Sequence, residues 1–146
     1  MEQYPFIEAD PIVDFSFQIP QEYVLSANKL SEGVFAKTKQ IQAGMRGSFM
    51  RAKEYIQNMT DLYLRYAHIE PIDTPVGEIF YVGGLGYHPL DPANYHPAVE
   101  KFVVDRFVKA GILPDDDGSH IPVVSFCPLP QVKRTQYEFR LVFYKL

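Results

Sequence analysis

Carboxylates stand on both sides of one amphipathic segment in the second half of the chain. Asp91 precedes this segment, and Asp115, Asp116 and Asp117 follow it. Carboxylate oxygens bind hard cations such as Mg2+, which can activate a water molecule and neutralise charge on a phosphoryl group. A helix of about sixteen residues alone would hold the two groups of acids ~24 Å apart. They can share a metal only if neighbouring strands or loops fold the chain back.

Other side chains near these acids have related chemistry. Asn94 and His96 follow Asp91 closely and carry side chains that can bind a metal ion, although either also suits the cap of a helix. His88 and His120 flank the same region, but Mg2+ selects oxygen over imidazole, so these histidines would contribute only to a Mn2+ or Zn2+ site. The acidic triplet also has a simpler interpretation, as a solvated turn after Pro114.

Length and composition predict one folded domain. The 146 residues are enough for one core and too few for two ordinary domains, and 47% of them are hydrophobic. The single cysteine, Cys127, lies in an apolar run, which favours a buried thiol in a reducing compartment. The chain has no apolar segment of membrane-spanning length and begins with polar residues. We therefore expect a cytoplasmic protein without a membrane partner.

Charge is segregated along the chain despite the modest net charge of −4. Residues 29–65 hold seven Lys and Arg residues against three acids, whereas residues 66–121 hold nine acids against three bases. Such segregation fits a protein that binds phosphates with one part and a cation with another, although a solvated helix face would look the same. The residues expected to contact nucleic acid are the basic ones of the first segment: Lys29, Lys37, Lys39, Arg46, Arg51 and Lys53.

Hydrophobic periodicity predicts the elements that must position these residues. Strands are expected over 11–19, 76–82, 121–127 and 137–145, and a long helix over 39–66 with an apolar stripe that includes Ala52, Ile56, Leu62 and Tyr66. A second helix should begin near Pro97, with Asn94 or His96 as its cap, and end at Gly111 in the left-handed conformation. Polar or glycine-rich turns are expected over 26–33 and 83–86, and the latter lacks the following helix that a phosphate-binding loop needs. The order strand, helix, strand, helix, strand, strand predicts an α/β (α+β) domain over 1–146: a mixed sheet of about four strands with two main helices.

The stretch over 75–117 contains Asp91-Pro92-Ala93-Asn94, Lys101, Ala110-Gly111 and Asp115-Asp116. This stretch resembles the core of the RusA family of Holliday junction resolvases. The family signature has Asp-x-Asp-Asn leading into a helix, a lysine on that helix, and Ala-Gly followed by an Asp pair. The strand and the Ser26-Ala27-Asn28-Lys29 loop upstream are also similar to the family.

The resemblance implies a homodimeric, Mg2+-dependent endonuclease that cuts branched DNA. By position, Asp91 and Asp116 would bind the metal, with Mn2+ as an alternative ion, and Lys101 would contact the scissile phosphate or its leaving group. Asp115 would flank the site, and Asn94 is a further candidate ligand. The catalytic residues implied are thus Asp91, Lys101 and Asp116.

Two departures from the family pattern keep other functions open. Ala93 occupies the place of a second aspartate, and Tyr87-His88-Pro89-Leu90 replaces an arginine-rich stretch. An active nuclease is one reading. A degenerate member that binds DNA or a protein without cutting is the second, and a structural or adaptor protein with a solvated acidic turn is the third.

Overall fold

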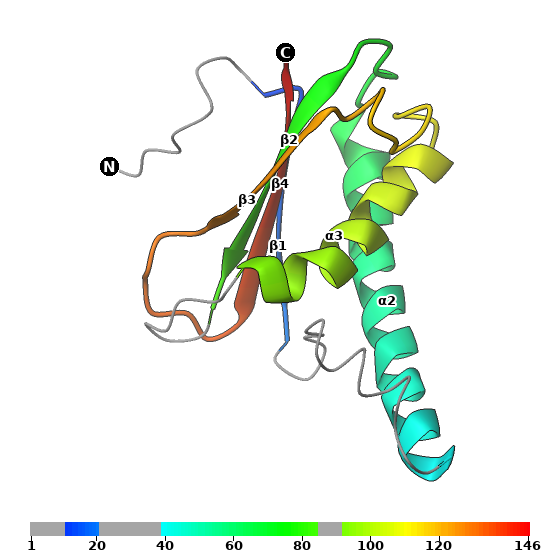
Figure 1. Ribbon diagram of the computed structural model, residues 1–146, viewed down its shortest axis with the longest axis vertical. Helices are drawn as coiled ribbons and strands as arrows, with labels where there is room; N and C mark the ends of the chain where they lie inside the picture. The colour runs from blue at the N-terminus through cyan, green and yellow to red at the C-terminus, as the bar shows by residue number, and fades with distance from the viewer. Residues whose placement is uncertain (1–10, 21–38, 85–91) are drawn as a thin grey trace.

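The computed structural model describes the backbone of residues 11–20, 39–84 and 92–146, and the side chains of residues 11–20, 50–84 and 98–146. They form a four-stranded sheet with helices packed on one face (Figure 1). In chain order the elements are β1 (Val13–Ile19), α2 (Lys39–Ala67), β2 (Val76–Gly83), α3 (Pro92–Lys109), β3 (Val123–Pro128) and β4 (Tyr137–Lys145). The expected single-domain α+β fold, with four strands and two main helices, is confirmed.

The sheet has the order β1-β4-β2-β3. Strand β4 pairs antiparallel with both β1 and β2, whereas β2 and β3 run parallel. Parallel neighbours need a crossover connection, and α3 supplies it. This connection holds α3 beside β2, a strand whose residues are all buried.

The main core lies between the sheet and the two helices. Strand β1 shows the predicted alternation, because Val13, Phe15, Phe17 and Ile19 are buried and the residues between them are exposed. Helix α3 contributes Val99, Val103 and Phe107, each fully buried, and the Phe107 ring meets Phe143 of β4 edge-on at 5.5 Å between centroids. Among the helices that the structure describes, none has a stretch long and apolar enough to cross a bilayer.

Two details of the helices differ from the sequence-based expectation. Helix α3 begins at Pro92 and not near Pro97, so Asn94 and His96 lie inside the helix and do not cap it. Both prolines suit a first helical turn, and the earlier one starts the helix.

On α2, Leu62 and Tyr66 are exposed. A repeat of 3.6 residues from the buried Ile56 leads to Thr60 and Tyr63 on the core side. The turn predicted over 26–33 lies outside the described residues. Of the turn predicted over 83–86, Gly83 is the last residue of β2, and residues 85 and 86 lie outside the described residues.

The C-terminus of α3 reverses the chain. Gly111 has φ 79°, as expected, and its N–H donates to the Val108 carbonyl at 3.0 Å while the Ile112 N–H donates to the Phe107 carbonyl at 3.0 Å. This pattern is a Schellman motif. The Ile72 N–H then donates to the Ile112 carbonyl at 2.8 Å, which ties the reversed chain to the segment entering β2. The residues that follow the turn are thereby brought back alongside α3.

We expect Gly111→Ala to destabilise the fold by ~1 kcal/mol, because a β-carbon is strained in the left-handed conformation. Gly118→Ala is the matched control: apart from the glycine and its chain neighbours, no described atom lies within 4 Å of either added β-carbon, and of the two only Gly111 has a φ in the left-handed region. Urea denaturation of both variants measures the difference. Equal stability of the two would show that the turn does not depend on the left-handed residue.

Candidate functional site

Lys101 and Asp116 meet beside α3, although they are far apart in the chain. The Lys101 Nζ donates to Asp116 Oδ2 at 2.7 Å and lies 3.0 Å from Asp105 Oδ1, one turn along the same helix. The side chains are 55% exposed for Lys101 and 30% exposed for Asp116, so solvent and a ligand can reach the pair. Two of the three catalytic residues implied by the resemblance are therefore neighbours.

The contact stabilises the charged forms of both partners. The hydrogen bond from Lys101 is the largest influence that lowers the pKa of Asp116 below its ordinary value. The bonds to Asp116 and then to Asp105 raise the pKa of Lys101. At neutral pH the pair is an ammonium facing carboxylates, a combination that can bind a phosphate on one side and a cation on the other.

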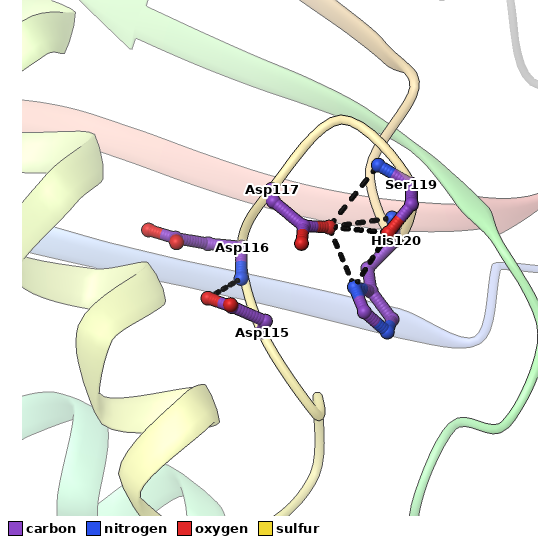
Figure 2. A network of polar contacts seen from close by, with 5 residues as sticks. All are labelled: Asp115, Asp116, Asp117, Ser119 and His120. Carbon is purple, nitrogen blue, oxygen red and sulfur yellow. Dashed lines mark hydrogen bonds and ion pairs between the residues drawn. The ribbon is translucent and has the colours of Figure 1, made fainter.

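The other two aspartates of the triplet bond within their own turn (Figure 2). Asp115 Oδ1 accepts the Asp116 N–H at 2.7 Å. Asp117 Oδ1 accepts the Ser119 hydroxyl at 2.6 Å and lies 2.6 Å from Nδ1 of His120. These contacts, that of Ser119 first, lower the pKa of Asp117 to about 2. Figure 2 shows Asp116 extending to the opposite side of the turn from Asp117, and its carboxylate bonds to Lys101 of α3.

Ser119, His120 and Asp117 do not form a catalytic triad. Ser119 Oγ lies 3.2 Å from His120 Nδ1, the same ring nitrogen that meets Asp117. A triad needs the histidine to contact the nucleophile and the carboxylate through different nitrogens. The contacts among Asp117, Ser119 and His120 hold the turn together. For these three residues they agree with the interpretation of the acidic triplet as a solvated turn.

Sequence reasoning missed two acids that lie beneath this site. Glu78 of β2 is fully buried, and its pKa is raised first by burial and then by the charge and hydrogen-bonding contact of Glu100 on α3, with Asp116 adding a smaller effect. Glu100 is partly buried, and burial also raises its pKa. One signal was available: a lone acid inside the apolar run of a strand with no exposed face must itself be buried.

The remaining predicted ligands cannot be placed in this geometry. Asp91 lies outside the described residues, and Asn94 and Ala93 belong to α3 but their side chains are not described. Over the side chains that are described, no three Asp, Glu, His or Cys residues are arranged to hold a metal ion. Mg2+ is often held by one or two carboxylates together with waters and substrate phosphates. As one exposed carboxylate, Asp116 fits that role together with waters, substrate phosphates or a ligand outside the described side chains.

Only part of the predicted phosphate-binding surface is described. Arg51 is exposed on α2, and the Lys53 Nζ lies 6.0 Å from the centroid of the Phe102 ring on α3. Lys39 and Arg46 belong to α2 without described side chains, and Lys29 and Lys37 lie outside the described residues. The nucleic-acid surface therefore stays a prediction.

No protein-family model matches this chain, and no curated protein matches it at a significant level.

We expect Lys101→Met to raise the pKa of Asp116 toward its ordinary value, because the variant removes the hydrogen bond and the charge that hold it down. Lys109→Met is the control, since Lys109 is exposed at the end of the same helix. Carbon-13 NMR titration of the aspartate carboxyls measures both. An unshifted Asp116 in the Lys101 variant would show that the two side chains do not interact in solution.

Proposed function

We propose that this protein is a metal-dependent endonuclease that hydrolyses phosphodiester bonds in branched DNA, as in Holliday junction resolution during recombination and repair. The observation that carries the proposal is the contact between Lys101 and Asp116. These two residues are separated by a helical turn reversal, yet their charged groups are 2.7 Å apart at an exposed position. A purely solvated acidic turn has no need of this pairing.

The charge balance around Lys101 also supports a cation-dependent activity. Glu78, Glu100, Asp105 and Asp116 influence one another or Lys101, and Lys101 is the one cation in that set. A DNA phosphate approaching these carboxylates would be repelled. A divalent cation removes that repulsion, so acids and DNA can meet only when a cation lies between them.

Each residue has a defined task in this proposal. Asp116, with Asp91, would hold Mg2+ or Mn2+, and Asn94 or Asp115 would complete its oxygen ligands. The bound metal would supply an activated water and neutralise phosphoryl charge. Lys101 would place its ammonium at the phosphate, where negative charge builds in the transition state. Asp105 would orient Lys101 through the contact along the helix.

The proposal includes a homodimer, because resolving a four-way junction requires two cuts. It also includes the cytoplasmic location expected from the sequence.

One observation favours the alternative in which a degenerate protein binds without cutting. The described side chains offer no group of three metal ligands. The two functions differ in a single outcome, which is cleavage of the bound DNA.

Replacing Asp116 by Asn should slow junction cleavage by orders of magnitude while leaving the fold intact. The variant keeps the shape and removes a metal-binding charge. The rate should fall at least ~100-fold, since even residues that only orient a metal ligand contribute 10–100-fold. Asp73→Asn, at an exposed position before β2, is the control and should cleave like the parent. Full cleavage by the Asp116 variant in Mg2+ would remove Asp116 from the mechanism.

The basic surface of α2 can be tested by the salt dependence of DNA binding. If Arg51 and Lys53 neutralise phosphates, replacing both by Ala should reduce the slope of log K against log salt by up to ~2. Lys133 and Lys145 are exposed elsewhere in the chain, so a double variant of these two serves as a charge-matched control. A slope that changes equally in both double variants would mean that α2 is not the DNA-binding surface.

A further inference from the structure

Glu78 occupies a position that a charged group rarely occupies. It lies on the helix-facing side of β2, in alternation with Val76 and Phe80 of the main core. Its side chain is fully buried, and neither of its carboxyl oxygens has a hydrogen-bond donor among the described residues. An ionised carboxylate in that position would forfeit its hydration without compensation, so it must acquire a cation or a proton.

The neighbour of Glu78 is a second carboxyl group. Glu100 on α3 lies within hydrogen-bonding reach of it. Two ionised carboxylates cannot bond to each other, because both only accept hydrogen bonds. When one of them carries a proton, its O–H donates to the other, and the missing donor of Glu78 is supplied.

Among the described side chains, the one cation that influences the pair is engaged elsewhere. Lys101, adjacent to Glu100 in the chain, directs its ammonium to Asp116 and Asp105. In the sheet, Glu78 lies between Phe143 of β4 and Val124 of β3, which do not titrate. The charged groups that influence the pair are therefore two further carboxylates, Asp105 and Asp116, and the ammonium of Lys101.

The space around Glu78 selects between a metal ion and a proton. Mg2+ keeps several of its waters in protein sites, and each oxygen of Glu78 has less than 1 Å² of accessible surface. A proton needs no space and no waters. The burial that excludes a hydrated ion is the same burial that makes a shared proton favourable.

We propose that Glu78 and Glu100 share one proton at neutral pH, and that this carboxylic acid–carboxylate pair is a pH-sensitive clasp between β2 and α3. The clasp does not depend on the DNA substrate proposed above, because it concerns the stability of the fold. At alkaline pH the proton is lost, and two like charges then face each other inside the core. The contact between strand and helix beneath Lys101 changes from attractive to repulsive.

The sign of the effect on stability follows from linkage. The pKa of Glu78 is raised, from its ordinary 4.5 to about 10. Below the ordinary value the folded and unfolded chains both carry the proton. Between the two values only the folded chain keeps it, so stability falls as pH rises, by up to about tenfold in the folding constant per pH unit.

Glu78→Gln tests the clasp, because an amide has the size of the acid and donates to Glu100 at every pH. We expect the urea midpoints of the parent and the variant to diverge between pH 5 and pH 9, with the variant the more stable at the alkaline end. Glu70→Gln, at an exposed position, should follow the parent throughout. Parallel curves for the parent and Glu78→Gln would overturn the proposal.

Carbon-13 NMR of the glutamate carboxyls in the parent protein gives a second test that does not depend on folding of a variant. One carboxyl of the pair should keep its protonated chemical shift at pH 7 and titrate far above the others. Ionised shifts for every glutamate at pH 7 would likewise overturn the proposal.

Discussion

The packing of α3 against β2 is the interaction on which the rest of the candidate site depends. Val99, Val103 and Phe107 of the helix are buried without residual exposure, and the crossover from β2 to β3 fixes the helix beside the strand. This packing also fixes the positions of the polar residues on the same helix. Glu100 faces Glu78 of β2, and Lys101 faces the chain that returns after the helix. The apolar contacts thus decide where the charges lie.

The carboxylates that this packing brings together repel one another unless positive charge is present. Lys101 supplies that charge to Asp105 and Asp116 at the surface. Glu78 lies too deep for a hydrated ion and is suited to a proton. Negative charge beside α3 is therefore neutralised in two ways. The exposed ion pair of Lys101 and Asp116 is accessible to a ligand, whereas the buried pair of Glu78 and Glu100 is not. An exposed acidic site with spare negative charge is what a cation-dependent phosphodiesterase would need.

The sequence predicted the order and type of all six described elements, because each has a strong period or a clear break. Strand β4 was predicted with its observed bounds, and Gly111 ends α3 as its position suggested. The start of α3 was misplaced, since Pro92 and Pro97 both suit the first turn of a helix and the earlier one begins it. On α2, the apolar Leu62 and Tyr66 suggested a stripe that the true helical repeat does not follow.

The candidate site was predictable only where it depends on local sequence. Lys101 and Asp116 were chosen by resemblance, and their contact required the chain reversal at Gly111, which a spacing argument along a straight helix does not reveal. The resemblance had already separated Asp116, as a ligand, from Asp115, as a flanking residue, and the oxygens of Asp115 and Asp117 bond within the turn. Glu78 was missed because one acid in an apolar strand attracts no attention until its strand is known to be covered on both faces.

Incubating the pure protein with a four-way DNA junction and Mg2+, with and without a chelator, tests the central claim most directly. The account predicts that the junction is cut in Mg2+, that linear duplex of the same sequence is cut far more slowly, and that the chelator stops both reactions. A junction that stays intact in Mg2+ and in Mn2+ would contradict the proposed nuclease. Salt-sensitive binding without cleavage would then identify the non-cleaving alternative.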